Sequence, residues 1–317
     1  MNRRALIVLV VALIALVGIR WMQQRTHKIS LAEPDRVELL PNFTMDLISR
    51  IELRGPVSGE LMLERKGGRW IIPSSYGHLA KSDKVDELAL ELEALSGQFR
   101  SEREDVLADY GLADTTAVSM KLISHSGEEL AHLHLGSSLS RGGLFLCRAG
   151  SSKVYSSQSG LLRIFNLWGD AREPDARGFL DMTLWTWDPA QVESFTVVSA
   201  DDRMVFNLTE SDTLSGEASW LIDGVPANKT AVDQVLGTLK NLKGKDLLDP
   251  AVDHGFSEGN RHLEISLIEG EAYTLLFGQG DGEDGDVPFK LKDGAAIYAL
   301  YSSYPDRIFK ARAEFTH

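Results

Sequence analysis

Apolar and polar residues alternate over much of the chain after residue 47, and turn residues separate the alternating runs. Alternation with a period of two is typical of a β-strand with one buried face. The first runs cover residues 48–53, 61–63, 118–122 and 133–135. Tight turns at Gly67-Gly68 and at Gly127 separate neighbouring runs. The pattern therefore predicts antiparallel hairpins.

A different spacing interrupts these strands once. Val85, Leu88, Leu92 and Leu95 recur three or four positions apart. This spacing places the four side chains on one face of an α-helix. We therefore expect one amphipathic helix to pack its apolar face against the predicted sheet.

The same order of elements returns 144 positions later, where Gly255 matches Gly111 and Arg307-Ile308-Phe309 matches Arg163-Ile164-Phe165. A second helix is predicted by Val232, Val235, Leu239 and Leu242, and Asn228 or Thr230 is expected to cap it. This period is far longer than the ~20–50 residues of solenoid repeats, so it indicates tandem domains.

Ten residues of the repeated pattern are predicted to shape the fold, although the second unit departs from the first at His254 and Phe256. In each unit a Trp opens a short strand, a glycine closes a turn after the helix, and a second glycine ends a hairpin. Glycine in such a turn allows backbone angles that other residues resist. The ten residues are Trp70, Asp109, Tyr110, Gly111, Leu112, Gly136, Trp220, Asp253, Gly255 and Gly278.

These patterns predict an α+β fold class with an N-terminal single transmembrane helix. Two tandem homologous units follow, each an antiparallel sheet with one main amphipathic helix. The expected segments are a signal-anchor at 1–28, a tether at 29–47, a first repeat at 48–167, a connector at 168–191 and a second repeat at 192–311.

The N-terminal segment carries an unbroken apolar run from Ala5 to Ile19 after two arginines. Extended to Met22, a helix there is ~27 Å long, close to the ~30 Å hydrocarbon core of a bilayer. A cleaved signal peptide is the alternative, with Ser30-Leu31-Ala32 as its cleavage region. We expect residues 5–22 to hold the chain as a single-pass protein in a bacterial inner membrane, with its main domain periplasmic.

The charge of the chain excludes one class of partner. Residues 1–28 hold five basic residues and no acidic ones, so the remainder carries 28 basic and 46 acidic residues. An acidic surface without basic patches argues against a nucleic-acid partner. The single Cys147 excludes an internal disulfide framework.

No catalytic motif is present: a P-loop, GxSxG, HExxH and a dinucleotide fingerprint are all missing from the sequence. His125, His132 and His134 fall on one predicted hairpin and offer a candidate metal cluster, with an exposed polar face as the plainer interpretation. We predict no catalytic residue, no cofactor and no metal.

A glycine-rich loop carries four acidic residues, Asp281, Glu283, Asp284 and Asp286. Calcium binding needs several carboxylate oxygens, but Lys292 stands where an EF-hand requires a bidentate glutamate. A solvated hairpin loop is therefore the favoured interpretation.

Three segments resemble a bacterial domain-of-unknown-function family, and with their matches they cover about residues 48–310. They are Gly68-Arg69-Trp70, Asp109-Tyr110-Gly111-Leu112 and Leu133-His134-Leu135-Gly136. Members of this family accompany gliding-motility-type ABC transporters as auxiliary components. The resemblance supplies no catalytic residues. It implies two tandem copies, with an ABC-transporter permease or other envelope proteins as partners.

The leading functional hypothesis is a non-enzymatic, membrane-anchored accessory or scaffold subunit of an ABC-type export or envelope complex. The alternative is an envelope glycan- or lipid-binding module, because sugar faces stack on aromatic rings such as those of Trp70, Trp185, Trp187 and Trp220. A hydrolase with an unrecognised site, built around the three histidines, is the third hypothesis.

Overall fold

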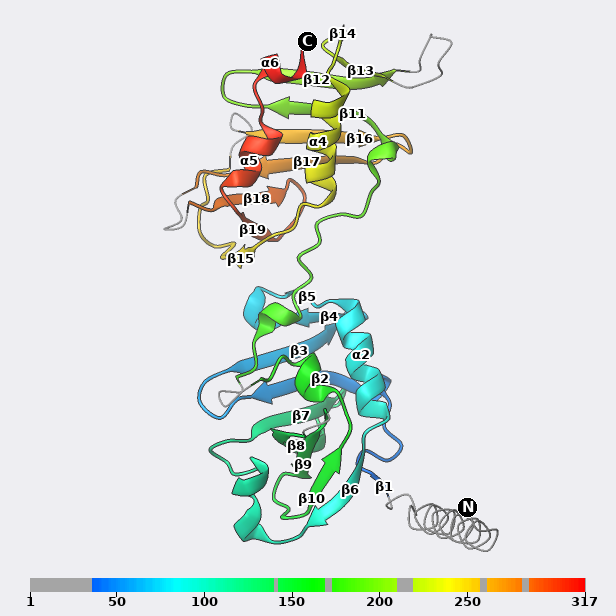
Figure 1. Ribbon diagram of the computed structural model, residues 1–317, viewed down its shortest axis with the longest axis vertical. Coiled ribbons are helices and arrows are strands. Elements are labelled where there is room, and N and C mark those ends of the chain that lie inside the picture. Colours follow the sequence, from blue (N-terminus) through cyan, green and yellow to red (C-terminus); the bar gives the residue numbers. More distant parts are fainter. Residues whose placement is uncertain are drawn as a thin grey trace, which may run out of the picture. The chain divides into compact units, whose positions relative to one another are not determined.

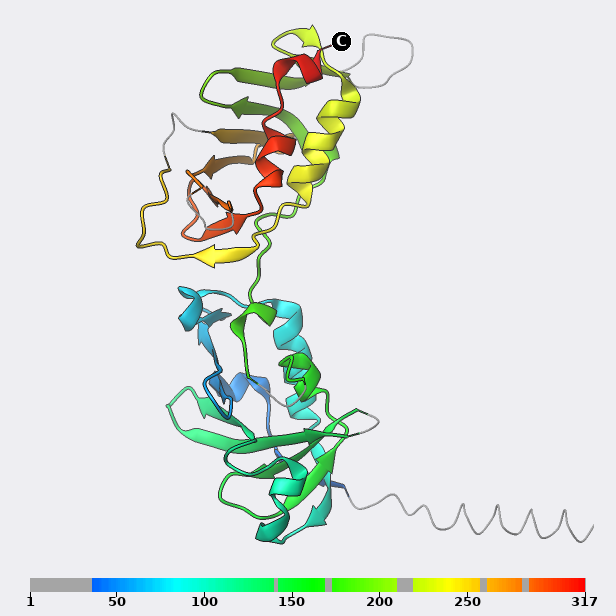
Figure 2. The same ribbon diagram turned by 60° about the vertical axis from the view of Figure 1, so that its left-hand side comes forward.

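A computed structural model of the chain describes residues 36–139, 142–168, 173–209, 219–256, 261–280 and 285–316. The described residues form two antiparallel sheets, one of ten strands and one of nine (Figures 1 and 2). We refer to each sheet with its helices as the first and the second sheet unit.

The first sheet consists of two meanders joined in the middle. Its order is β1-β6-β10-β9-β8-β7-β2-β3-β4-β5. The pairing of β2 with β7, which sets Ile51 opposite Leu122, joins the meanders. The strands are β1 (Arg36–Glu38), β2 (Ile48–Arg54), β3 (Glu60–Lys66), β4 (Arg69–Ile72), β5 (His78–Leu79), β6 (Ser96–Ser101), β7 (Val118–Ser124), β8 (Glu129–Ser138), β9 (Leu144–Arg148) and β10 (Val154–Ser157).

The second sheet follows the same path, without a counterpart of β1. Its order is β14-β13-β12-β11-β16-β17-β18-β19-β15. Here β11 pairs with β16 and sets Phe195 opposite Ile265. The strands are β11 (Val192–Val198), β12 (Arg203–Thr209), β13 (Ser219–Ile222), β14 (Val225–Pro226), β15 (Asp246–Leu248), β16 (His262–Leu267), β17 (Ala272–Phe277), β18 (Val287–Leu291) and β19 (Ile297–Leu300).

Helices cover one face of each sheet (Figures 1 and 2). The α-helices are α2 (Ser82–Glu93) and α3 (Leu161–Ile164) in the first unit, and α4 (Lys229–Lys240), α5 (Ser303–Ile308) and α6 (Arg312–Phe315) in the second. Short 3-10 helices lie at Met45–Leu47, Pro73–Ser75, Glu104–Val106, Ala108–Tyr110, Ala176–Gly178 and Pro189–Gln191. Asn228 caps α4, because its side chain accepts hydrogen bonds from the backbone of Thr230 and Ala231 at 3.0 and 3.3 Å.

The core of each unit lies between the sheet and its main helix. The predicted apolar face of each helix is confirmed for three residues each, which are all buried: Val85, Leu88 and Leu92 on α2, and Val232, Val235 and Leu239 on α4. Leu95 and Leu242 are buried too, but they lie two residues beyond the ends of the helices. Alternate strand residues such as Leu133 and Leu135 are buried with them. The residues between them, such as His132 and His134, are only half-buried. One face of each sheet is therefore packed and the other faces solvent, as is common for antiparallel sheets.

The predicted fold class is wrong for the described chain. In place of a transmembrane helix followed by two α+β units, the structure is dominated by two large antiparallel sheets of ten and nine strands. The strand content exceeds the sequence prediction because several strands, among them β1, β5 and β14, have only two or three residues. Alternation over so few residues gives no signal.

The expected anchor, residues 5–22, lies outside the described residues, as does the first part of the expected tether, residues 29–35. Among the helices that the structure describes, none combines the length and the apolar character needed to cross a bilayer.

One carboxylate ties the chain leaving the first unit to the turn between β2 and β3. Glu173 accepts hydrogen bonds from the backbone N–H groups of Val57, Ser58 and Gly59, the first two at 3.0 and 3.2 Å. Desolvation raises the pKa of Glu173, but these three bonds together outweigh it, so its pKa lies below the ordinary value. The charged form of the Glu173 carboxylate therefore accepts the hydrogen bonds that hold this turn.

The packing of α2 predicts contrasting effects of two leucine truncations. Leu88 is fully buried, whereas Leu90 on the same helix is 69% exposed. We expect Leu88→Ala to lower the free energy of unfolding by about 2–5 kcal/mol, because it leaves a cavity under the helix. Leu90→Ala, the matched control, should stay within about 0.5 kcal/mol of the parent protein. Urea unfolding followed by circular dichroism measures both, and equal losses would contradict the described helix orientation.

Candidate functional site

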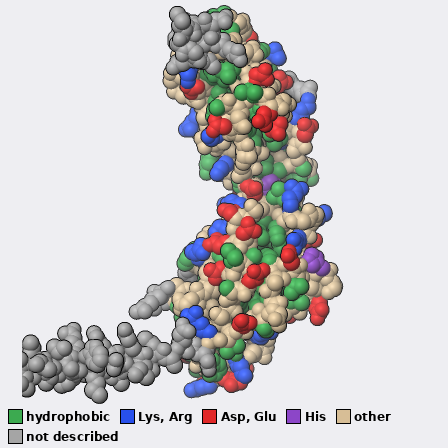
Figure 3. Space-filling view, turned by 90° about the vertical axis from the view of Figure 1, so that its right-hand side faces the viewer, with side chains coloured by type: hydrophobic (Ala, Val, Ile, Leu, Met, Phe, Trp, Pro, Cys, Tyr) green, Lys and Arg blue, Asp and Glu red, His purple; other side chains and the backbone are tan. Residues whose placement is uncertain are grey.

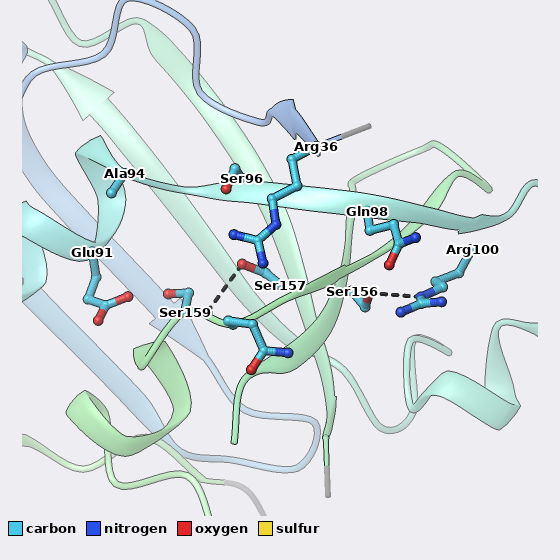
Figure 4. A pocket seen from close by; sticks show the side chains of 10 residues that line it. Arg36, Glu91, Ala94, Ser96, Gln98, Arg100, Ser156, Ser157 and Ser159 are labelled. Atoms are coloured by element: carbon cyan, nitrogen blue, oxygen red, sulfur yellow. Dashed lines mark hydrogen bonds between the residues drawn. The ribbon is translucent and has the colours of Figure 1, made fainter. Parts of the chain in front are cut away.

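A polar hollow of about 220 Å³ lies at one end of the first sheet (Figure 4). Strands β1, β6 and β10 form its floor, and the last turn of α2 forms one wall. The residues that line it are Arg36, Glu91, Ala94, Ser96, Gln98, Arg100, Ser156, Ser157, Gln158 and Ser159.

Strand register assembles the floor of the hollow from distant parts of the sequence. Arg36 on β1 lies opposite Gln98 on β6, and Gln98 lies opposite Ser156 on β10. Side chains of paired residues stand on the same face of a sheet, so these three form one row across the strands. Gly97, which precedes Gln98 on β6, faces the other side of the sheet, where an added Cβ would lie 2.8 Å from Tyr155.

Two arginines supply the positive charge of the hollow. The Arg100 Nε donates to the Ser156 hydroxyl at 2.8 Å (Figure 4). Arginine carries five N–H donors, so most of the Arg100 donors remain available to a ligand. Arg36 is exposed, and Figure 4 shows it reaching from β1 toward Ser157. The described residues place no ion pair on either arginine.

The opposite end of the hollow carries a negative charge. Glu91 lies in the last turn of α2, and its Oε2 accepts a hydrogen bond from the backbone N–H of Gly160 at 2.8 Å. The C-terminal end of a helix carries a partial negative charge and favours cations. Figure 4 shows Glu91 and Arg100 at opposite ends of the hollow, with Arg36 between them. The hollow is therefore polarised.

A buried hydroxyl faces the hollow without a partner. Ser159 is only 8% exposed, and no group in the described part of the chain forms a hydrogen bond with its Oγ. The backbone N–H of Ser159 is satisfied, since it donates to the Ser157 hydroxyl at 3.3 Å. Leaving a buried hydroxyl unpaired costs about 1–3 kcal/mol, so this side chain is poised to bond a bound molecule.

The glycines predicted from the sequence take part in one close backbone contact in each unit, between the turn after the helix and the glycine that ends the hairpin. We call this contact the lock. Gly111 and Gly255 adopt left-handed φ values of 67° and 68°. The carbonyl oxygen just before each of them packs on the glycine that ends the hairpin. An added Cβ on Gly136 would lie 2.4 Å from the Tyr110 oxygen, and one on Gly278 would lie 2.2 Å from the His254 oxygen. These glycines therefore serve the fold and lie outside the hollow.

The other predicted motif residues have structural surroundings. Leu112 is buried, and Tyr110 packs edge-on against Phe145. Asp109 is exposed, whereas the Asp253 carboxylate accepts a hydrogen bond from the backbone N–H of Gly255 at 2.9 Å.

The tryptophans that motivated glycan stacking are mostly inaccessible. Trp185, Trp187 and Trp220 are each at most 7% exposed, and the Trp185 ring N–H donates to the Leu239 carbonyl at 2.8 Å. Trp70 is half-buried. Buried rings cannot stack on a sugar, so the aromatic argument for a glycan site does not apply to these three residues.

The predicted histidine cluster is only partly assembled. His132 and His134 share the open face of β8, with ring centroids 5.4 Å apart. His125 instead contacts the Asp46 carbonyl oxygen through its Nε2 at 3.1 Å. In the described ranges no group of three or more His, Cys, Asp or Glu side chains is arranged to hold a metal ion.

The histidine face shows one contact of the kind that hydrolases use. The Ser119 hydroxyl lies 2.8 Å from the His132 Nε2, and the Glu129 carboxylate lies 3.8 Å from the His132 Nδ1. The second distance is too long for a hydrogen bond, and Lys121 pairs with the same carboxylate at 3.2 Å. The Ser119–His132 pair therefore lacks the orienting hydrogen bond to a carboxylate that activates such a pair.

Two further candidate groups offer no site. Asp281, Glu283 and Asp284 of the acidic loop lie outside the described residues, and Asp286 pairs with Lys245 at 2.6 Å. Burial raises the pKa of the Cys147 thiol to about 11, so it stays protonated and unreactive at neutral pH.

Sequence reasoning missed the hollow because no short motif marks it. One signal was available: Ser156 is polar and buried, whereas Leu300, at the same offset of 144 positions, is an apolar core residue. At this matched position the first unit has a buried polar residue and the second unit has an apolar one.

Comparison with known proteins identifies a family for the chain. The model of a family described as "Domain of unknown function (DUF4340)" matches residues 70–259. No curated protein and no solved structure matches the chain significantly.

The lock predicts that adding a methyl group at either hairpin glycine destabilises its unit. We expect Gly136→Ala and Gly278→Ala each to lower the free energy of unfolding by about 1–3 kcal/mol, because the new Cβ displaces a carbonyl oxygen. The matched control is Gly237→Ala inside α4, where an added Cβ meets no atom within 4 Å. It should raise stability by about 0.5–1 kcal/mol. Chemical denaturation measures all three, and a neutral Gly136→Ala would contradict the lock.

The lowered pKa of His132 predicts that stability depends on pH. Burial is the main cause that lowers its pKa below the ordinary 6.5. As the pH falls, His132 is therefore protonated in the unfolded chain before it is protonated in the folded protein. Its contribution to stability is fully present above about pH 6.5 and is lost as the pH drops toward the folded pKa. His132→Gln should flatten the slope of thermal stability between about pH 7 and pH 5. Identical slopes in differential scanning calorimetry of the two proteins would contradict this assignment.

Proposed function

Because the chain belongs to the DUF4340 family, a domain of unknown function, we propose its role from its architecture. It acts as a non-enzymatic accessory or scaffold subunit of an ABC-type export or envelope complex. The observation that carries this proposal is the lock: the residues repeated in both units, including Gly136 and Gly278, build the fold and lie apart from the polar hollow.

We also propose that the two units are tandem copies of one module. In support, both sheets run through the same strand order and are joined by equivalent pairings, β2 with β7 and β11 with β16. Each has one twelve-residue helix over the packed face. A duplicated module presents two related surfaces, which suits a subunit that contacts several neighbours in an assembly.

The open faces of the sheets support a role in protein contacts. Lys121 on β7 and Glu264 on β16 stand between buried neighbours and therefore point away from the helices. On the side drawn in Figure 3, acidic and basic side chains are interspersed, and no broad basic surface is visible. Mixed charge of this kind supports a protein partner over a nucleic acid.

The proposed location is the bacterial inner membrane, with both sheet units on the periplasmic side. The apolar composition of residues 5–22, flanked by arginines, supports attachment through this segment. An ABC-transporter permease is the proposed partner, and other envelope proteins are the alternative.

The second candidate function is an envelope glycan- or lipid-binding module. The polar hollow favours it, because its buried Ser159 hydroxyl is unsatisfied by the described chain. The hydrolase hypothesis has only the Ser119–His132 contact in its support.

Photo-crosslinking tests the scaffold proposal. A photoreactive residue at Lys121 or Glu264, on the open sheet faces, should crosslink to a permease or ATPase subunit of an ABC transporter in cells. The matched control carries the same residue at Asp86, which is exposed on the helix side of the first unit. It should give at least about tenfold less of the same product, since each interface covers only part of a protein surface. Recovery of the full-length protein alone after mild extraction, without crosslinked transporter subunits, would contradict the proposal.

A further inference from the structure

We propose that the hollow at the end of the first sheet binds a small zwitterion. The oxyanion of the ligand, a phosphate or a carboxylate, lies between Arg36 and Arg100. Its ammonium group lies at Glu91. This inference goes beyond the scaffold role and deepens the ligand-binding candidate, on which it rests.

The floor of the hollow suits an oxyanion. Guanidinium groups form paired, charge-assisted hydrogen bonds with phosphate and carboxylate oxygens. Arg36 and Arg100 are both exposed and both line the hollow. The Ser156 hydroxyl holds Arg100 at 2.8 Å, which reduces the freedom that the side chain loses when it binds a ligand.

The wall formed by α2 suits an ammonium group. The Glu91 carboxylate has one oxygen on the Gly160 backbone, which fixes its position at the end of the helix. The negative end of the helix dipole adds to its charge there. A simple anion would meet this repulsion, whereas a molecule with charges of both signs satisfies both ends of the hollow.

The buried Ser159 hydroxyl gives an independent reason to expect a ligand. It lines the hollow, is only 8% exposed, and is unpartnered within the described chain. A hydroxyl both donates and accepts hydrogen bonds, so it can bond either half of a zwitterion.

Size and composition narrow the ligand class. At about 220 Å³, the hollow is smaller than the ~300–1,000 Å³ typical of sites for drug-sized molecules. No aromatic residue lines it, so it lacks the ring that commonly stacks on a sugar face. Phosphoethanolamine fits these requirements, both as a free molecule and as the headgroup of a phospholipid.

Isothermal titration calorimetry of the full-length protein in a maltoside detergent tests the inference. Phosphoethanolamine should bind with a Kd of about 1 mM or below. Inorganic phosphate alone and ethanolamine alone should each bind at least about tenfold more weakly, because each engages one end of the hollow. Equal affinity for phosphate and phosphoethanolamine would overturn the zwitterion assignment, and no binding of any of the three would overturn the site.

Charge-neutral variants locate the binding. Arg100→Gln and Glu91→Gln should each weaken phosphoethanolamine binding by about tenfold. Arg54→Gln, which removes an exposed arginine on β2 outside the hollow, should leave the Kd unchanged. Full affinity in both hollow variants would place the ligand elsewhere and overturn the site.

Ser159→Ala separates a binding role from a structural one. If the hydroxyl awaits a ligand, its removal should leave the melting temperature of the empty protein unchanged or raised, while it weakens phosphoethanolamine binding about three- to tenfold. A lower melting temperature with unchanged affinity would show that the hydroxyl serves the fold, and would overturn its assigned role.

Vesicle flotation distinguishes the two sources of the ligand. If the ligand is a lipid headgroup, the protein should float with phosphatidylethanolamine vesicles more than with phosphatidylcholine vesicles, and Glu91→Gln should abolish the difference. If the ligand is a free molecule, the preference should be absent while calorimetric binding persists. Both results support the zwitterion site, and a preference that survives Glu91→Gln would overturn it for the lipid. None of these outcomes bears on crosslinking to a transporter, so the two proposals fail separately.

Discussion

The structure depends on one close contact that occurs in each unit, a backbone carbonyl packed directly on a glycine. The Tyr110 oxygen rests on Gly136, and the His254 oxygen rests on Gly278. This contact seats the turn that follows the helix against the end of a central hairpin. Because a side chain at either glycine would occupy the place of the oxygen, each contact requires glycine at this position.

Hydrophobic packing and polar chemistry occupy different parts of the first unit. Leu88 and Leu92 pack α2 onto the sheet and are fully buried. On another side of the same helix turn, Glu91 and the row from Arg36 to Ser156 line the hollow. The hollow therefore lies at the end of α2, which stops at Glu93.

Sequence periodicity predicted the contacts that lie close along the chain. The spacing of Val85, Leu88 and Leu92 identified a buried helix face, and the glycine turns lie where they were expected. The fold class was wrong because the very short edge strands show no alternation. The hollow could not be predicted, because it depends on the register that sets Arg36 opposite Gln98 and Gln98 opposite Ser156. Such register is a tertiary property that local patterns do not encode.

The joining of two meanders in each sheet also bears on the order in which strand pairings form during folding. Strands β2 to β5 and β7 to β10 each follow one another closely along the chain, so their hairpins form from local contacts. The pairing of Ile51 with Leu122, and of Phe195 with Ile265, must instead close a long loop that contains the main helix. Closing long loops before they are stabilised is slow. We therefore expect this central pairing to form later than the hairpins, and until it forms the edges of β2 and β11 remain unpaired on that side.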